Sequence, residues 1–538
     1  MGRVVSGCPR ADRILKKALL FWINFILSAS PLCPQSVNLP LDHWAYDYLE
    51  RMETKGVLHR LRDGSRPFTR AKVAEYAQEM DAYAKKHPEK LSKIEKELLE
   101  RLKGELWDEL ETKEVAVQKD QREPHFYSWR GSSGTVHLDL LSGGNGILRD
   151  THAEKTEREI YSPYYGGILR GTVWGIGIYS DNRIFTEWGS RSYVQNYKAS
   201  QGYPQNVERD SSRATWDTSD SYFCLQWKGF FLQAGRDNLC WGPTFFGGLS
   251  LSGWTPSFDL VKVATCIGAS TVTWIHGALR SDFVHKWISA HRLELSVSRE
   301  VDLGVSETVI YGNRGIEMAY VNPLIPYLIA EHTLGDKDNV TLGLDVDIHT
   351  IRNLKLYGEL FIDDLFAPWE IFRDYWGNKL AFTLGGYWVD PLGLKDTGLR
   401  WEYTRIDPYV YTHRDSVNVY ENYNIGLGHF LQPNSDAWIF RGEHRFSMSF
   451  LSSLEFRALR HGTGDRQSPH REEEGDRKRF LEGVVEQEKR LSGSMEWEIF
   501  RDCRAGAEVA RLWNKNRNHK ENDNRTWNEI VFMLRMNW

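Results

Sequence analysis

The chain has 538 residues, of which 41% are hydrophobic and 26% are charged. This length allows one large domain plus a small one, and the apolar content excludes a disordered chain. The formal net charge of -5 disfavours a nucleic-acid-binding protein, because such proteins carry a basic excess on at least one domain. The six cysteines include no CxxC pair, so their spacing predicts no metal or redox site, and we expect no cofactor.

The amino terminus has the pattern of a secretory signal peptide. The apolar run 18–27 is preceded by Arg10, Arg13, Lys16 and Lys17 and followed by Ser28, Ala29 and Ser30. The run is too short to span a bilayer as a helix. We therefore predict a signal peptide over residues 1–36, with cleavage between residues 28 and 36.

Residues 37–123 are predicted to form a small helical periplasmic domain and a linker. The stretch 38–80 indicates two short helices around a turn, and 88–113 indicates a longer amphipathic helix. Its aliphatic residues recur at three- and four-residue steps: Leu91, Ile94, Leu98, Leu102, Leu106 and Leu110. Packing in a core is the favoured interpretation of this stripe, and a partner-binding face is the alternative.

The carboxyl-terminal segment is typical of a lipid-facing strand. One face of it carries Ile530, Phe532, Leu534, Met536 and Trp538, and the alternate face carries Glu529 and Arg535. Lipid must be met by hydrocarbon, whereas a lumen tolerates polar groups, so this alternation predicts the last strand of an outer-membrane barrel. A terminal aromatic strand also resembles the signal that the barrel-insertion machinery reads. An ordinary edge strand is the alternative.

Alternation and turn residues predict eighteen strands in residues 124–538. They lie near 135–141, 168–180, 182–188, 221–228, 229–236, 257–264, 270–280, 288–299, 302–311, 339–349, 354–363, 379–389, 398–407, 438–448, 451–460, 491–501, 503–513 and 526–538. The segment 257–264 is included partly because the alternation of connections requires it.

The connections alternate between short turns, such as 180–182 and 299–302, and long polar loops, such as 189–220, 312–338, 408–437 and 461–490. Short periplasmic turns opposite longer external loops, with an even strand number, are the rule for outer-membrane barrels. The predicted fold is therefore all-β: a transmembrane antiparallel barrel of about 18 strands with a helical amino-terminal domain. A soluble β-solenoid or sandwich is the alternative.

Several motifs occur in an order that resembles the Wzi family of outer-membrane capsule-assembly proteins. They are residues 39–46 (LPLDHWAY), 56–58 (GVL), 66–70 (RPFTR), 235–236 (GR), 241–243 (WGP), 311–315 (YGNRG), 322–323 (NP), Glu359 with 363–364 (DD), 428–429 (GH) and 433–436 (PNSD). The resemblance covers nearly the whole mature chain. It implies an eighteen-stranded barrel with a periplasmic helical part that acts as a lectin and holds capsular polysaccharide on the cell surface.

The first of these motifs also resembles a single S-layer-homology motif, in which Trp44 and Arg70 would contact cell-wall polymer. Lys72 stands where that motif usually carries an acidic residue. A packed Trp44 and a solvated Arg70 are the favoured interpretation, and wall contact is the alternative.

Sugar rings stack on aromatic faces, and acidic sugars pair with arginine. The candidates for polysaccharide contact are residues of these types in the predicted outer loops or their rims: Tyr164, Tyr165, Trp188, Arg191, Tyr193, Trp241, Trp254, Trp369 and Trp376. For each of them, anchoring at the membrane interface is the competing role.

Catalysis is not expected. Residues 248–252 (GLSLS) nearly form a nucleophile elbow, but Ser252 stands where the tight turn needs glycine. No zinc-protease motif or phosphate-binding loop appears. The favoured function is a polysaccharide-binding barrel in the bacterial outer membrane, in contact with lipid. A porin or channel with a periplasmic domain that contacts the cell wall is the alternative.

Overall fold

The computed structural model describes residues 36–111, 117, 121–153, 158–190, 208–209, 213–227, 229–281, 285–366 and 373–538. Almost all of the predicted signal peptide, 1–36, lies outside the described residues. Among the helices of the described residues, none has the length and apolar composition needed to cross a membrane.

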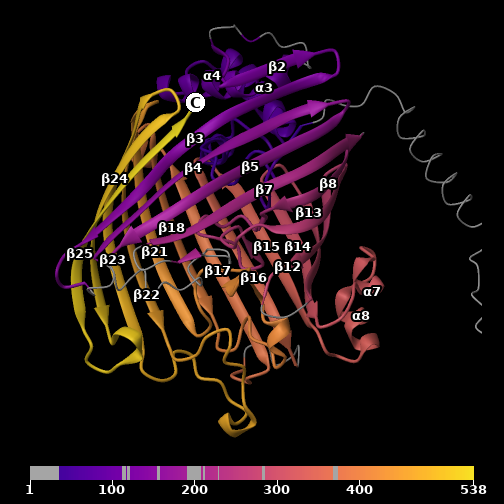
Figure 1. Cartoon of the computed structure of the whole chain (residues 1–538), viewed down its shortest axis with the longest axis vertical. Coiled ribbons are helices and arrows are strands. Elements are labelled where there is room, and N and C mark those ends of the chain that lie inside the picture. The colour runs from indigo at the N-terminus through magenta and orange to yellow at the C-terminus, as the bar shows by residue number, and fades with distance from the viewer. Residues whose placement is uncertain are drawn as a thin grey trace, which may run out of the picture.

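Eighteen long antiparallel strands form a closed barrel in the described part of the chain (Figure 1). Closure comes from the last strand, β25 (Arg525–Asn537), which pairs with the first long strand, β3 (Gly134–Arg149). The others are β4 (Glu159–Val173), β5 (Ile176–Gly189), β7 (Arg213–Trp227), β8 (Phe230–Asp237), β11 (Phe258–Ile267), β12 (Ser270–Leu279), β13 (Lys286–Ser296), β14 (Val301–Gly312), β15 (Asn339–Ile351), β16 (Leu354–Leu365), β17 (Asn378–Val389), β18 (Thr397–Ile406), β21 (Ser435–Ser447), β22 (Phe450–His461), β23 (Glu486–Phe500) and β24 (Cys503–Lys515). Two short strands, β2 (Tyr127–Gly131) and β6 (Glu208–Arg209), pair with β3 and β7.

The two ends of the barrel differ in their connections. One end, here called the turn end, carries short links such as 174–175, 352–353, 448–449 and 501–502, and the carboxyl terminus lies there. The other, here called the loop end, carries the long connections 150–158, 190–212, 238–257, 313–338, 366–377, 407–434 and 462–485. The predicted alternation of short turns and long loops is therefore confirmed.

The predicted alternation of faces is also confirmed on β25. Ile530, Phe532 and Leu534 are exposed on the outer wall. On the inner face, Glu529 accepts a hydrogen bond of 2.6 Å from Arg149 Nε, and Arg535 pairs with Asp42 at 3.0 Å. An apolar outside and a charged inside are what a barrel wall between lipid and a polar lumen requires.

One predicted boundary is wrong. The segments 168–180 and 182–188, with a turn at 180–182, correspond to β4 and β5, whose turn is Trp174–Gly175. Both turn residues have positive φ, 51° and 76°, which suits a tight link. The remaining predicted strands overlap observed ones, and 257–264, the least supported by its own pattern, falls on β11.

The amino-terminal region forms a helical bundle of α2 (Ala45–Thr54), α3 (Arg70–Lys86), α4 (Lys93–Glu105) and α5 (Trp107–Glu111). The predicted helix 88–113 is two helices, separated at Leu106. Ser92 and Glu95 form a capping box that starts α4. Leu98, Leu102, Leu106 and Leu110 are buried in the bundle core, so the core interpretation of the aliphatic stripe is confirmed.

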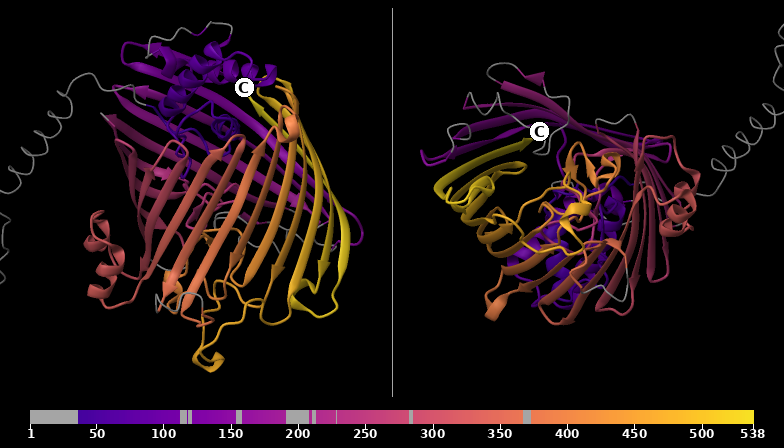
Figure 2. Two further views of the ribbon diagram at one scale, coloured as in Figure 1. Left: turned by 180° about the vertical axis from the view of Figure 1, so that it is seen from behind. Right: turned by 90° about the horizontal axis from the view of Figure 1, so that it is seen from below.

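This bundle, residues 36–111, is here called the plug, because it sits within the turn end of the barrel (Figures 1 and 2). Buried ion pairs join it to the wall: Asp63 to Lys355 at 2.5 Å, Arg400 to Glu50 at 2.6 Å, and Arg101 to Glu498. A three-stranded sheet of β1 (Ser65–Arg66), β9 (Cys240–Trp241) and β10 (Leu251–Ser252) joins it to the loop 238–257.

Candidate functional site

Two loops of the loop end fold inward and fill one side of the lumen. Residues 238–257 and 407–434 form a hydrophobic core with the inner faces of strands β11 to β18. Tyr411 Oη and Tyr420 Oη donate to the backbone oxygens of Leu249 and Ser250, each at 2.8 Å. Glu359 on β16 accepts hydrogen bonds from the backbone of the same loop, 2.9 Å from Leu249 N. The inward loops are therefore fixed to the wall by buried polar contacts as well as by apolar packing.

The opposite side of the lumen is lined by charged residues. Arg490 on β23 donates to Glu529 at 3.0 Å and also pairs with Glu508 on β24. Arg457 donates to Glu455 at 2.8 Å on β22. Charges on one strand and on adjacent strands thus neutralise one another across the lumen face.

Three outer loops meet at an aromatic cluster, here called the loop cluster: Tyr375, Trp376, Tyr409 and His470. The ring of Trp376 stacks on that of His470, with centroids 4.0 Å apart and an interplanar angle of 6°. Tyr409 contacts His470 edge-on at 5.2 Å, and its Oη donates to Glu474 at 3.1 Å.

The loop cluster is supported from below by charge pairing. Lys478 is buried and pairs with Asp407 at 2.7 Å, which holds the loop 462–485 against the loop 407–434. The backbone nitrogen of Trp376 donates to Asp476 O at 3.1 Å. Two exposed arginines, Arg471 and Arg477, lie beside the loop cluster. A third, Arg405, places its guanidinium 3.9 Å from the centroid of the Phe480 ring. Aromatic faces beside cations suit the apolar faces and carboxylates of sugars.

Two of the predicted polysaccharide residues, Trp376 and Trp254, lie in loops at the loop end and are not fully buried. Trp376 lies in the loop cluster. Trp254 is 60% exposed in the loop 238–257, with its ring 6.4 Å from Phe430. Arg191, Tyr193 and Trp369 lie outside the described residues.

The other predicted residues lie on the barrel wall or in its interior. Tyr165 and Trp188 project from the outer wall, where the competing role as interface anchors fits them. Tyr164 faces the lumen and packs on Phe185 at 5.2 Å. Trp241 is 1% exposed in the inward-loop core, so its ring is not accessible to a polymer.

Sequence reasoning missed Tyr375, Tyr409 and His470. The available signal was that they fall in or beside three predicted long loops. What the sequence pattern does not give is which loops meet, because that depends on strand order around the barrel.

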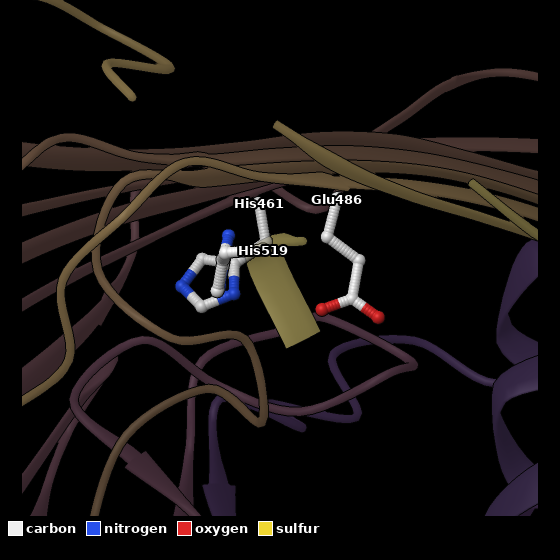
Figure 3. Close-up of side chains that lie close together, drawn as sticks. All are labelled: His461, Glu486 and His519. Atoms are coloured by element: carbon white, nitrogen blue, oxygen red, sulfur yellow. The ribbon is translucent and has the colours of Figure 1, made fainter. Parts of the chain in front are cut away.

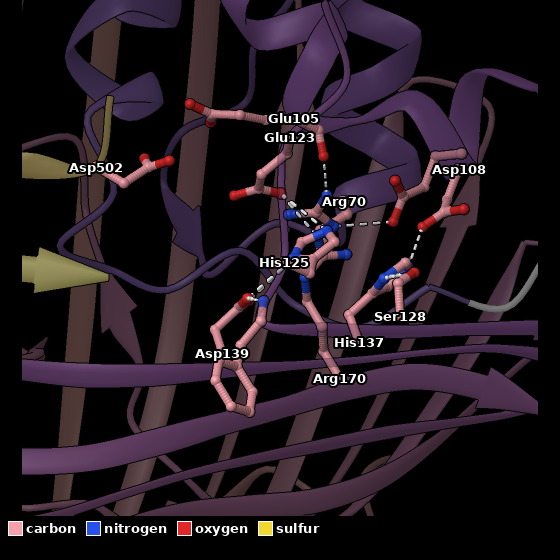
Figure 4. Close-up of polar contacts among 12 residues, drawn as sticks. Arg70, Glu105, Asp108, Glu123, His125, Ser128, His137, Asp139, Arg170 and Asp502 are labelled. Atoms are coloured by element: carbon pink, nitrogen blue, oxygen red, sulfur yellow. Dashed lines mark hydrogen bonds and ion pairs between the residues drawn. The ribbon is translucent and has the colours of Figure 1, made fainter. Parts of the chain in front are cut away.

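A separate polar layer joins the plug to the wall (Figure 4). Arg70 is 5% exposed and donates from Nε to Glu109 at 2.9 Å. Trp44 Nε1 donates to Glu105 at 3.2 Å. The interpretation of Trp44 as a packed residue agrees with this geometry, whereas the expectation of a solvated Arg70 is wrong, because a buried carboxylate pairs with its guanidinium.

On the wall side of this layer, His137 on β3 pairs with Asp108 of the plug at 2.6 Å, and Arg170 on β4 donates to Glu123 at 2.7 Å. His125 lies 3.0 Å from Asp139. Of these contacts, His137–Asp108 joins the plug to the barrel, and Arg70–Glu109 lies within the plug. Glu123 and His125 attach the segment between the plug and β2 to β4 and β3.

A cavity of about 350 Å³ lies between residues 38–42 of the plug and strands β5, β7 and β8. Its lining includes five carboxylates, Asp42, Asp181, Asp217, Asp220 and Asp237, against two arginines, Arg183 and Arg236. This excess of negative charge disfavours an acidic sugar inside the cavity.

Within the described residues, two groups of side chains have the composition of a metal site. Glu53, Asp347 and His349 belong to the ion-pair network around Lys355, since Asp347 lies 2.8 Å from Lys355 Nζ and His349 3.1 Å from Asp347. The second group, His461, Glu486 and His519, lies at the loop end.

Comparison with known proteins identifies a family and several similar solved structures. The family model described as capsule assembly protein Wzi matches residues 175–527. Among solved structures, the chain is similar to Wzi of Escherichia coli, described as an outer-membrane protein involved in group 1 capsule assembly and a carbohydrate-binding β-barrel. The TM-score is 0.58 at 12% identity, over 92% of this chain and 99% of that one.

Weaker likenesses are found to OccK8 (OprE) of Pseudomonas aeruginosa, with a TM-score of 0.44 at 10% identity over 75% of this chain and 98% of that one. For OccK3 (OpdO) of the same organism, the TM-score is 0.43 at 12% identity, over 75% of this chain and 95% of that one. Curated protein sequences give no match.

Proposed function

Because the chain belongs to the Wzi family of capsule assembly proteins, we propose that it is an outer-membrane barrel that holds capsular or extracellular polysaccharide at the cell surface. The family predicted from the sequence motifs and the eighteen-stranded fold are both confirmed. In this proposal the loop end faces outward and the turn end, with the helical plug, faces the periplasm, following the rule for outer-membrane barrels.

The observation that carries the proposal is the loop cluster. Trp376, His470 and Tyr409 come from three separate loops and are held together by ring contacts and by the buried Lys478–Asp407 pair. A preformed aromatic surface with cations at its rim loses little conformational entropy when a polymer binds. The carbohydrate binding described for the Escherichia coli relative is consistent with this role.

The plug disfavours the alternative of an open porin. Three of its acidic or basic residues make buried ion pairs with the wall, and the inward loops fill the lumen beside strands β11 to β18. A channel would need a continuous aqueous path past both. Contact of the plug with cell-wall polymer through Trp44 and Arg70 has no support in the geometry, because the Arg70 guanidinium is buried.

The test combines retention of polysaccharide with conductance. Deleting the gene is expected to shift polysaccharide from the cell-associated to the shed fraction, and the purified protein is expected to bind the extracted polysaccharide while planar bilayers show no steady current. Unchanged retention after deletion, together with steady open pores, would favour the channel.

A further inference from the structure

His461, Glu486 and His519 come together at the loop end (Figure 3). His461 ends β22 and Glu486 begins β23, and the two residues are directly opposite in the strand register. His519 comes from a short 3-10 turn, η8 (Arg517–His519), between β24 and β25. One ligand atom from each residue lies within 4.8 Å of the others.

The hydrogen bonds of the two rings orient them for metal binding. His461 Nε2 lies 3.0 Å from Gly464 O, and His519 Nδ1 lies 2.8 Å from Val484 O. A carbonyl oxygen only accepts, so these two nitrogens carry the hydrogens and the other nitrogen of each neutral ring carries a lone pair. Metal-binding histidines are usually held in this way, by a backbone carbonyl or a carboxylate. Glu486 is oriented too, since Asn514 Nδ2 donates to its Oε1 at 2.9 Å.

From this arrangement we infer that His461, Glu486 and His519 bind a divalent transition metal, with Zn²⁺ as the best match to two imidazoles and one carboxylate. Bond lengths of about 2.0–2.2 Å require ligand atoms roughly 3.3 Å apart, so the side chains close slightly around the ion. The metal would join η8 to β22 and β23, adding to the bond of 3.0 Å from Asn516 Nδ2 to Val485 O.

The test is Zn²⁺ titration of the tag-free, chelator-treated full-length protein by calorimetry. We expect one saturable site whose affinity falls at least tenfold in His519→Ala and in Glu486→Gln, and Co²⁺ at the site is expected to give the visible absorption of a four-coordinate ion. His152→Ala is the control, because that side chain is 74% exposed in the loop 150–158. Absence of a stoichiometric site, or the same affinity in His519→Ala, would overturn the inference.

A different observation concerns the outside of the barrel. The connection between β14 and β15 carries α7 (Met318–Val321) and α8 (Tyr327–Leu334), here called the outer hairpin. Every view places it outside the ring of strands, against the wall near the loop end (Figures 1 and 2).

The outer hairpin covers polar side chains on the outer face of the barrel wall. His291 on β13 and Glu307 on β14 pair at 2.8 Å, and Tyr327 stacks on His291 at 4.4 Å while its backbone nitrogen donates to Glu307 at 3.0 Å. Trp287 Nε1 donates to Arg314 O at 3.1 Å. Polar groups facing hydrocarbon are costly unless they are paired, and the hairpin supplies the pairing.

The other side of the outer hairpin is apolar and exposed. Leu324 is 87% and Met318 72% exposed, and Ile316, Leu328 and Ile329 are exposed with them. The outward residues Leu293, Val305 and Leu344 of the neighbouring strands continue this surface along the wall. We propose that the outer hairpin is embedded in the outer leaflet, with lipid acyl chains as the occupant of this face, as for other interfacial helices.

The test uses the full chain with Cys266→Ser, which removes the exposed thiol among the described cysteines. Spin labels are placed through Leu324→Cys, Leu328→Cys and, as a control, Glu473→Cys, whose native side chain is 78% exposed. In phosphatidylcholine vesicles, the labels at 324 and 328 are expected to be accessible to oxygen and shielded from a water-soluble nickel reagent, with the reverse at 473. Nickel accessibility at 324 equal to that at 473, or disulfide dimers through 324, would overturn the proposal.

Discussion

Lys355 is a single buried residue on which the attachment of the plug depends. Its side chain is fully buried, and its Nζ lies 2.5 Å from Asp63, 2.8 Å from Asp347 and 3.2 Å from Glu50. Lys355→Met removes the cation that these three carboxylates share, while Glu50 keeps Arg400 and Asp347 keeps His349. Loss of one partner of a buried ion pair costs about 3–5 kcal/mol. We expect a lower urea midpoint of the helical circular dichroism signal, with Lys520→Met as the exposed control. An unchanged midpoint would show that the carboxylates are neutralised by other means.

The pKa of Glu53 makes the stability of the plug depend on pH. Burial raises the pKa of Glu53 to about 8, from an ordinary value of 4.5, with Asp63 and Asp347 adding to the rise and His349 and Lys355 opposing it. Between these two values the folded state binds a proton that the unfolded state has released. The contribution to stability is therefore fully present below pH 4.5 and is lost as the pH rises through about 8.

Glu53→Gln removes this group from the titration. We expect the urea midpoint of the wild type to fall relative to that of the variant as the pH is raised from 4.5 to 8. Parallel midpoints across that range would contradict the raised pKa. Glu79→Gln, on a partly exposed side chain of α3, is the matched control.

At the scale of the element, the loop cluster makes a prediction about binding. Trp376→Ala removes the ring that stacks on His470, and one aromatic contact is worth about 0.5–1.5 kcal/mol, so affinity for the polysaccharide should fall roughly two- to tenfold. Trp188→Ala is the control, because Trp188 lies on the outer wall. Binding would be compared by calorimetry on protein that shows native heat-modifiable gel mobility. Equal losses in both variants would place the binding surface elsewhere.

The strands were largely predictable, because a wall between lipid and a polar lumen imposes a period of two on each of them. The exception is the segment 180–182, where the sequence predicts a turn. Ser180, Asp181 and Asn182 have the composition of a turn, yet they lie inside β5. Ser180 and Ser221 hydrogen bond side chain to side chain at 2.8 Å on one face, and Asp181 pairs with Arg183 at 2.7 Å on the other. Polar side chains that hydrogen bond or pair with neighbouring side chains can therefore interrupt the expected apolar–polar alternation without ending the strand.

The candidate site was less predictable than the strands. Trp376 was found by residue type and loop position, but its partners His470 and Tyr409 lie in loops that follow other strands. Their meeting depends on the order of strands around the barrel and on the buried pair of Lys478 with Asp407. The placement of the long loops was not predictable either. The loop 313–338 lies outside the barrel and the loop 407–434 lies inside it, and the sequence pattern of neither loop predicts this.

Across the complete barrel, the plug and the inward loops occupy the same lumen and are connected to each other. The sheet β1–β9–β10 pairs Ser65 with Trp241, so the plug is hydrogen bonded to a loop that is itself fixed to the wall by Glu359. Release of the plug therefore has to break this sheet as well as the ion pairs between plug and wall. This predicts a barrel that is closed at rest and that does not open through loss of a single surface contact.

Weakening two plug-to-wall ion pairs tests this prediction. Arg51 pairs with Asp390, and Arg101 with Glu498, on separate parts of the wall. The double variant Arg51→Ala, Arg101→Ala is expected to give transient currents in planar bilayers, whereas the wild type and the exposed control Arg471→Ala give none. A steady current through the wild type would mean that ions pass the plug in its bound position, and the barrel would then have to be regarded as a channel.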